Sequence, residues 1–191
     1  MASGSISLYA GLVLVSLAFN VAGSDVKQAS ITFAKNAYQY QFTIEIDAPL
    51  DVVHSIVTDY ANLAHINDDV LQSEVLEHYD EHRLKRRMWL NHCVLVFCFD
   101  LYFVEDVEEH NDGTITTTVI PAESNFRSGY SKWHIDAISP NVTRISVEAE
   151  QQPDFWIPPL IGPLVFKRAF MKEVRETGNK IEREAKRVGS K

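Results

Sequence analysis

A long amphipathic helix predicted near the C-terminal end constrains the fold more than any other feature of the chain. Apolar or small residues recur there at spacings of three and four, at Phe166, Phe170, Val174, Thr177, Ile181, Ala185 and Val188. This is the pattern of one buried helical face. A helix from Leu160 to Arg187 is roughly 42 Å long at about 1.5 Å per residue. A pair of short helices has no need of such a length, whereas a curved sheet wrapped around the helix does.

Upstream, the sequence predicts one strand followed by two short helices. The segment YQYQFTIEI, residues 38–46, alternates large apolar and polar side chains without a break, as a half-buried strand does. Asp47 and Pro49 then mark a helix start. A second short helix is predicted from Tyr60 to His65.

The middle of the chain reads as six further strands. From Val70 to Gln151, strand patterns follow one another with only turns between them, including the hairpin signal NDGT at 111–114. Because no helix separates these strands, we expect them to be antiparallel. The whole pattern predicts an α+β fold with a seven-stranded antiparallel sheet.

The first residues differ in kind from the rest. LYAGLVLVSLAFNVAG is an apolar run that ends in small residues, and its length suits a secretory signal peptide better than a membrane span. We therefore expect a signal peptide at 1–23, a polar linker at 24–37 and one domain at 38–188, although no Lys or Arg precedes the apolar run. The alternatives are an uncleaved N-terminal membrane anchor and a misassigned start codon.

The charge distribution narrows the classes of partner. The net charge is −8, which argues against a nucleic-acid-binding protein. From Lys167 onward, nine Lys and Arg stand against four Asp and Glu, so the predicted helix is the basic part of an acidic chain. A solvated outer surface explains this basic face, and the alternative is a peripheral contact with anionic lipid or an acidic partner. We expect a monomer.

No motif for catalysis, a metal or a cofactor is present. The seven histidines form neither HExxH nor an HxH pair, and the chain has no GxSxG turn and no glycine-rich phosphate loop. The carboxylates of EDVEEH at 105–110 precede a turn and predict a solvated hairpin end. Tyr130, His134 and Asp136 have the chemistry of acids and bases, but strand alternation points them outward. We therefore expect no catalytic residue, no metal site and no cofactor.

Cys93 and Cys98 are the two cysteines of the chain. In a regular strand, five residues span roughly 16 Å, whereas a disulfide needs Cα atoms within about 7 Å. A bridge therefore requires a turn or bulge between the two residues, and the prediction favours two buried thiols.

Several segments carry a family resemblance. FTIEIDAPLDVVHSIVTDYANLAHIN resembles the opening of the START-like or SRPBCC superfamily. HCVLVFCF, FRSGYSKWHI and TRISVEAEQQPDFWIPPLIGPLVFKRAF resemble a bacterial branch of that superfamily, which includes the polyketide cyclase/dehydrase and coenzyme Q-binding START-like proteins. The similarity covers roughly residues 38–187. One departure is Asn125, where Asp is expected before FRSG.

The resemblance implies a helix-grip fold, in which a curved seven-stranded antiparallel sheet wraps around the long C-terminal helix and two short helices follow the first strand. It also implies a cavity between the sheet and the helix. Such cavities hold lipids, quinones, sterols or aromatic polyketides.

Strand alternation indicates which side chains should face that cavity. Asp100, Lys132 and Arg144 need water, so the apolar residues that alternate with them should point inward. With residues from the first strand, the helix and the loop before it, the candidate ligand-binding residues are Tyr40, Phe42, Ile44, Arg86, Leu95, Phe97, Phe99, Leu101, Trp133, Val147, Phe155, Trp156, Phe166 and Phe170. The alternative for each apolar residue is ordinary core.

Three of these candidates depend on two separate arguments. Arg86 shares a strand face with Leu84 and Met88; if that face is internal, the Arg needs an anionic or carbonyl partner, such as a ligand head group. The alternative is a solvated convex face. Phe155 and Trp156 precede a proline pair at 158–159 that should fix them beside the start of the helix, as a rim or gate of the cavity or else as a passive plug.

These expectations favour a protein that binds a hydrophobic small molecule, such as a lipid or quinone, and carries or shields it. The compartment expected is an exported one, the bacterial periplasm. A polyketide cyclase- or dehydratase-like enzyme is the second hypothesis, and a ligand-independent interaction module is the third. A hollow core distinguishes the first two from the third.

Overall fold

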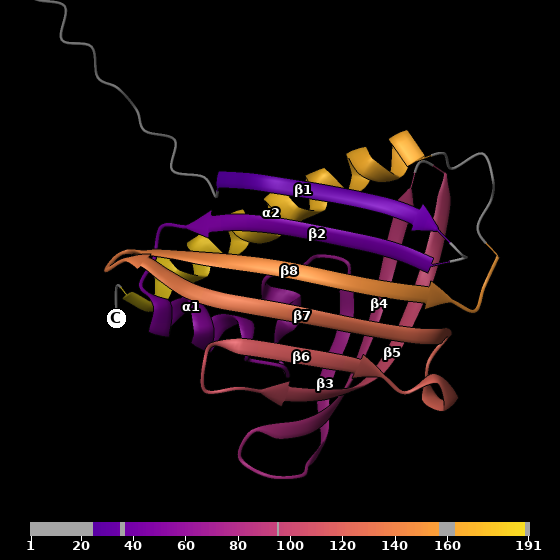
Figure 1. Ribbon diagram of the computed structural model, residues 1–191, viewed down its shortest axis with the longest axis horizontal. Coiled ribbons are helices and arrows are strands. Elements are labelled where there is room, and N and C mark those ends of the chain that lie inside the picture. The colour runs from indigo at the N-terminus through magenta and orange to yellow at the C-terminus, as the bar shows by residue number, and fades with distance from the viewer. Residues whose placement is uncertain (1–24, 35–36, 95, 157–162, 190–191) are drawn as a thin grey trace, which may run out of the picture.

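The computed structural model describes residues 25–34, 37–94, 96–156 and 163–189. One eight-stranded antiparallel sheet bends around the long helix α2, and the short helix α1 packs against α2 near the C-terminus (Figure 1). The strand order is β1-β2-β8-β7-β6-β5-β4-β3. This is the α+β helix-grip fold that the sequence predicts.

The strands are β1 (Asp25–Ala34), β2 (Ala37–Ile46), β3 (Val70–His78), β4 (Arg83–Val94), β5 (Phe97–Glu109), β6 (Thr114–Val119), β7 (Phe126–Ser139) and β8 (Val142–Pro153). The α-helices are α1 (Leu50–Val57) and α2 (Pro163–Gly189). Two 3₁₀ helices are η1 (Leu63–His65) and η2 (Pro121–Glu123). Among the described residues, no helix is long and apolar enough to cross a membrane.

The segment expected to be a polar linker is mostly strand, which corrects the strand count from seven to eight. β1 pairs with β2 along its length, with Ile31 opposite Tyr40 and Ala29 opposite Phe42. It lies at one edge of the sheet. An edge strand needs only one partner, so the weak apolar alternation of this segment is sufficient for pairing.

The β4–β5 hairpin corrects the prediction of two buried thiols. A turn at Val96 separates the strands, and Cys93 lies directly opposite Cys98 in the ladder. The two residues form a disulfide, and both are exposed. The sequence pattern conceals this turn because apolar residues continue through it.

The NDGT hairpin signal is confirmed between β5 and β6. Gly113 adopts a φ of 78°, in the left-handed region that glycine tolerates best. A Cβ at this position would lie 2.5 Å from the carbonyl oxygen of Ile135. Glycine is therefore favoured here for two reasons: the turn needs a positive φ, and the neighbouring backbone leaves no room for a Cβ.

The packed core leaves the middle of the grip hollow. Its most buried residues lie where α1 and α2 meet β2 and β8; Ile44, Ile46, Val53, Ile145 and Ile181 are each at most 1% exposed. A second apolar cluster contains Phe103, Val119 and Phe126, at the opposite end of β7. β3, β4 and β5 run steeply across the direction of β1, β2 and β8 (Figure 1), so the bent sheet and α2 surround the space between the two clusters.

Candidate functional site

A cavity of about 380 Å³ lies between the sheet and α2. Its lining comes from all eight strands, from α1 and α2, from η1 and the segments around it, and from the loop after β8. Most of the lining side chains are aliphatic or aromatic. Size and lining are those of a small-molecule site, which is typically concave, largely apolar and several hundred Å³ in volume.

The structure places nine of the fourteen candidate residues on the cavity wall. They are Tyr40, Phe42, Ile44, Arg86, Phe99, Leu101, Trp133, Phe155 and Phe170. Strand alternation located most of them, because a residue on the concave face of a bent sheet necessarily faces α2. Their contact with a ligand remains a prediction.

Three candidates lie away from the cavity wall. Val147 is only 1% exposed, but it lies between Phe42 and Trp133 in the ladder, and these larger side chains cover it. Phe97 is half-buried at the start of β5, outside the cavity lining. Trp156 is 74% exposed, so it is a surface residue. The side chains of Leu95 and Phe166 lie outside the described residues.

Aromatic contacts build the two ends of the cavity wall. Phe42 meets Phe170 at a ring-centroid distance of 6.1 Å and Trp133 at 6.2 Å. At the other end, Phe155 lies 5.8 Å from both Phe99 and Phe126. Phe155 is therefore part of the packed wall, whereas the neighbouring Trp156 is not. The proline pair at 158–159, expected to hold these two residues, lies outside the described residues.

Arg86 points into the protein and finds a carboxylate partner there. Its Nε and Nη2 donate to Oε2 of Glu105 at 3.0 and 2.9 Å, and both residues are buried. The Tyr60 ring lies 5.2 Å from the guanidinium carbon, within the range of a cation–π contact. The protein itself thus supplies the partner that a ligand head group was expected to provide.

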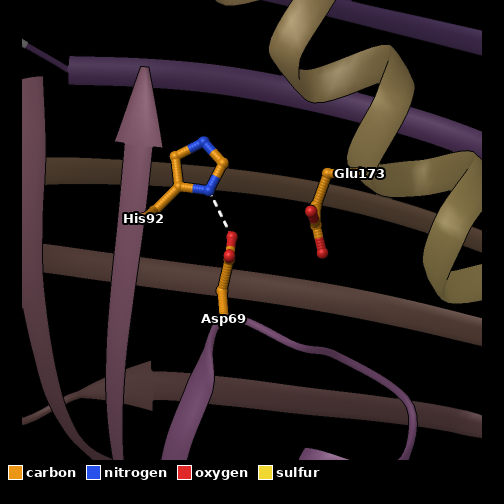
Figure 2. Close-up of side chains that lie close together, drawn as sticks. All are labelled: Asp69, His92 and Glu173. Carbon is orange, nitrogen blue, oxygen red and sulfur yellow. Dashed lines mark hydrogen bonds and ion pairs between the residues drawn. The ribbon is translucent and has the colours of Figure 1, made fainter. Parts of the chain in front are cut away.

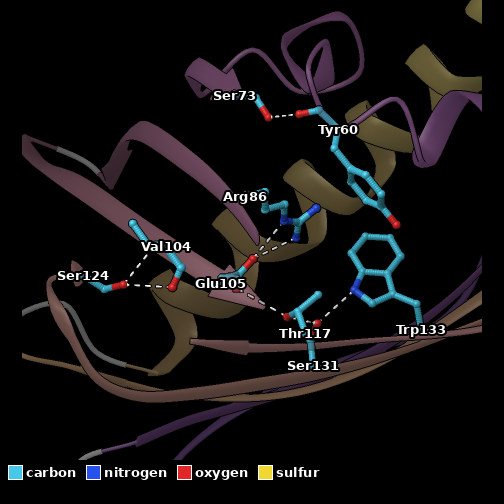
Figure 3. Close-up of polar contacts among 9 residues, drawn as sticks. All are labelled: Tyr60, Ser73, Arg86, Val104, Glu105, Thr117, Ser124, Ser131 and Trp133. Atoms are coloured by element: carbon cyan, nitrogen blue, oxygen red, sulfur yellow. Dashed lines mark hydrogen bonds and ion pairs between the residues drawn. The ribbon is translucent and has the colours of Figure 1, made fainter. Parts of the chain in front are cut away.

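A hydrogen-bond network continues from Glu105 across three strands (Figure 3). The Thr117 hydroxyl donates to Oε1 of Glu105 at 3.4 Å and bonds the Ser131 hydroxyl at 2.8 Å. The indole N–H of Trp133 donates to the Ser131 oxygen at 3.1 Å. We call Arg86, Glu105, Thr117, Ser131 and Trp133 the inner network.

Sequence reasoning missed most of the inner network. It placed Glu105 at a solvated hairpin end, which is wrong, because Glu105 is 3% exposed. Opposite charges at Arg86 and Glu105 are cross-strand neighbours, so the register of the β4–β5 hairpin would have revealed the pair. That register depends on the turn that the sequence pattern concealed.

Two tyrosines stay protonated at the cavity. Burial raises the pKa of Tyr40 well above its usual range, and the nearby Glu105 charge adds to the effect. Burial likewise raises the pKa of Tyr60, assisted by Glu109, whose Oε1 accepts the Tyr60 hydroxyl at 3.0 Å. The Tyr40 hydroxyl, in contrast, has no hydrogen-bond partner within the described part of the chain.

A second set of ionisable side chains lies on a partly exposed part of the cavity wall. Asp69 directly precedes β3, His92 lies near the end of β4, and Glu173 lies on α2 (Figure 2). All three line the cavity, and Nδ1 of His92 contacts the Asp69 carboxylate. We call these residues the outer cluster.

Burial raises the pKa of Glu173, and the Asp69 charge raises it further. His92 and the hydrogen bond from Thr177 act in the opposite direction. Sequence analysis missed this cluster because its members are far apart in the chain and share no motif.

Asn125, the one departure from the expected family pattern, has a structural role. Its side-chain oxygen accepts the backbone N–H of Tyr102 at 2.8 Å, and its Nδ2 donates to the carbonyl of Asp100 at 2.7 Å. A carboxylate can accept the first bond but cannot donate the second. The Asn125 amide therefore satisfies one backbone N–H and one backbone carbonyl of β5.

The comparisons with known proteins agree with this architecture. The model of a family described as polyketide cyclase / dehydrase and lipid transport matches residues 38–186. No curated protein matches the chain significantly. A START superfamily protein from Mycobacterium smegmatis is 17% identical with a TM-score of 0.61, over 78% of this chain and 98% of that one.

Two further solved structures represent different functions on the same fold. A STAR-related lipid transfer protein from Xanthomonas axonopodis is 15% identical with a TM-score of 0.56, over 80% of this chain and 98% of that one. The Zhui aromatase/cyclase from a Streptomyces species is 14% identical with a TM-score of 0.58, over 79% and 94%. At such identities the likeness shows the fold alone.

Proposed function

The chain belongs to the START-like family of polyketide cyclases, dehydrases and lipid transport proteins, and from this premise we propose that it binds a hydrophobic small molecule, such as a lipid or quinone. The molecule occupies the cavity between the sheet and α2 and is shielded there from water. Because the bound molecule is shielded, the protein can carry it through water from one site to another.

The observation that carries the proposal is the hollow itself. A cavity of about 380 Å³ with a largely apolar wall is costly to keep empty, because each unfilled volume forfeits contacts among the lining atoms. An apolar ligand restores those contacts. A ligand-independent interaction module has no need of such a space.

Two polar groups at the inner network give the ligand a preferred orientation. The third guanidinium nitrogen of Arg86, Nη1, has no hydrogen-bond partner among the described residues, and neither has the neutral hydroxyl of Tyr40. Both residues line the cavity. A carbonyl or hydroxyl oxygen on an otherwise apolar molecule can accept from both groups, which favours a quinone or a lipid over a plain hydrocarbon.

The proposed place of action is an exported compartment, with the bacterial periplasm first and an N-terminally anchored form as the alternative. Two observations support export. The apolar run after residue 7 has the length of a signal peptide, and the Cys93–Cys98 disulfide is of a kind that persists in oxidising compartments.

Delivery of a lipid or quinone requires a membrane encounter, and we propose a peripheral contact through α2. Lys167, Arg168 and Lys172 are exposed on this helix, where they can attract anionic headgroups. The protein acts as a monomer in this proposal.

Extraction and mass spectrometry of the gently purified full-length protein tests the proposal. The expected result is an apolar molecule with a carbonyl or hydroxyl group, present in an amount close to that of the protein. Protein that carries no such molecule, and takes none up from a total lipid extract, would contradict the proposal.

A cyclase- or dehydratase-like enzyme is the second candidate. It is favoured by Tyr40, which lines the cavity and whose neutral hydroxyl can donate a hydrogen bond to a substrate oxygen, whereas Tyr130, His134 and Asp136 do not line the cavity. Turnover of a polyketide that depends on Tyr40 would establish this candidate. Binding without turnover supports the carrier.

A further inference from the structure

The outer cluster has the composition of a metal site. Asp69, His92 and Glu173 each offer one ligand atom, and these atoms all lie within 4.8 Å of one another. The residues come from three separate segments, the loop before β3, the end of β4 and the middle of α2 (Figure 2). The helix-grip fold thus brings one imidazole and two carboxylates to a single point.

The spacing of the three atoms suits one ion after a small adjustment. In a tetrahedral site with bonds of about 2.0–2.1 Å, two ligand atoms lie roughly 3.3 Å apart. Nδ1 of His92 and the Asp69 carboxylate are in direct contact, closer than this separation, so the two side chains must move slightly apart to admit an ion between them. Glu173 extends from α2 beside this pair (Figure 2), with its ligand atom within 4.8 Å of the other two, so a rotation about its side-chain bonds can bring it to the same ion.

The charges of the outer cluster are not balanced by ion pairs within the described part of the protein. Two carboxylates face a single imidazole, and among the described residues no Lys or Arg forms an ion pair with Asp69 or Glu173. All three side chains are partly buried, which weakens the screening of their mutual repulsion by water. A divalent cation offsets two negative charges at once.

Neighbouring hydrogen bonds hold the ligating residues in place. The Asp69 N–H donates to the Asn67 side chain at 2.8 Å, and the Asp69 carbonyl accepts from the Asn91 N–H at 2.9 Å. The Thr177 hydroxyl donates to Glu173 at 3.3 Å. Outer partners of this kind orient ligands in metal sites.

We propose that Asp69, His92 and Glu173 bind a divalent transition-metal ion, with at least one coordination position open toward the cavity. One imidazole and two carboxylates suit Zn²⁺, Fe²⁺ or Mn²⁺, whereas Mg²⁺ and Ca²⁺ prefer oxygen ligands throughout. Three protein ligands leave room for water or for an oxygen atom of the bound molecule. The site would fix a polar end of that molecule at the outer part of the cavity.

Calorimetric titration of chelator-treated full-length protein with Zn²⁺ alone tests the proposal. The expected result is one Zn²⁺ per chain, with the affinity reduced at least about tenfold in His92→Gln and in Glu173→Gln. His78→Gln is the matched control, because His78 is an exposed histidine on β3, and it should bind as the wild type does. Absence of binding at millimolar Zn²⁺, or equal affinity in all four proteins, would overturn the proposal.

Cobalt substitution gives a readout that does not depend on a variant folding. Co²⁺ added to the wild-type protein should produce the visible absorption of a low-coordinate protein site, whereas the weak spectrum of hexaaquo Co²⁺ would contradict the site. Both experiments use the metal alone, so their outcome is independent of whether the cavity binds a lipid or quinone.

Discussion

The inner network and the outer cluster line the same cavity, but they differ in how their charges are compensated. In the inner network the Arg86 guanidinium donates two hydrogen bonds to the Glu105 carboxylate. Thr117 and Ser131 continue this series of hydrogen bonds. In the outer cluster two carboxylates share one imidazole. The inner side chains of Arg86 and Glu105 are 10% and 4% exposed, whereas those of His92 and Asp69 are 25% and 27% exposed.

This difference separates a mainly structural role from a functional one. A buried charge must be paired to be tolerated at all, so in the inner network the Arg86 and Glu105 charges pair with each other and link β4 to β5, and only Nη1 of Arg86 is left for a ligand. The outer cluster can remain unbalanced because water still reaches it. A cation or a polar group of a ligand can bind to such an unbalanced charge at a partly exposed site.

Breaking the inner network should have the largest effect on stability. Glu105→Gln leaves the Arg86 guanidinium buried without a counter-charge, and we expect the free energy of unfolding to fall by about 3–5 kcal/mol. Urea denaturation followed by circular dichroism measures this change. Glu108→Gln removes an exposed carboxylate from the same strand and serves as the control; equal stability of the two variants would contradict a buried, paired Glu105.

Filling the outer cluster with a metal should have the next largest effect. At a free Zn²⁺ concentration of 100 times the dissociation constant, linkage predicts about 2.7 kcal/mol of stabilisation, or roughly 5–10 °C in the melting temperature for a chain of this size. A thermal melt with and without Zn²⁺ measures the shift. His92→Gln should remove it, and an undiminished shift in that variant would place the ion elsewhere.

Removing the Tyr40 hydroxyl should change binding more than stability. Tyr40→Phe deletes a donor that has no partner among the described residues, so we expect little change in stability but roughly three- to tenfold weaker binding of a short-chain quinone. Equilibrium titration gives the affinity. Tyr130→Phe, at a residue that is 48% exposed, should be neutral, and an unchanged affinity in Tyr40→Phe would remove this hydroxyl from the site.

The smallest effect is expected from neutralising Glu173 in metal-free protein. Because its pKa is raised on folding, the folded state favours the protonated form, and stability is lost as pH rises from the ordinary glutamate pKa through the raised value. Glu173→Gln mimics the protonated form and should melt slightly higher than the wild type at neutral pH. The difference should vanish in acid, and a lower melting temperature at neutral pH would contradict the unfavourable charge.

The sequence predicted the architecture because its signals are local and periodic. The alternation of β2, the length of α2 and the turn at Gly113 each depend on neighbouring residues, and together they specify a helix grip. Alternation also oriented Phe99, Leu101 and Trp133 correctly toward the helix. The edge strand β1 was missed because its pairing depends on β2, at Ile31 and Ala29, rather than on its own pattern.

The charged groups of the cavity could not be predicted in the same way. Glu105 and Arg86 meet only through the register of a hairpin whose turn lies inside an apolar run. Asp69, His92 and Glu173 meet only through the tertiary fold. The exposure of Trp156 likewise depends on how the chain leaves β8, which no periodicity encodes.

Native mass spectrometry of wild type, Leu101→Trp and Leu71→Trp, each incubated with a total lipid extract, tests the central claim most directly. Leu101 lines the cavity, so an indole there should occupy the ligand's space, whereas Leu71 is 59% exposed and should tolerate the same substitution. We predict one bound apolar molecule per chain in the wild type and in Leu71→Trp, and none in Leu101→Trp. Equal occupancy in the two variants, or no bound molecule in the wild type, would contradict a ligand-binding cavity beneath α2.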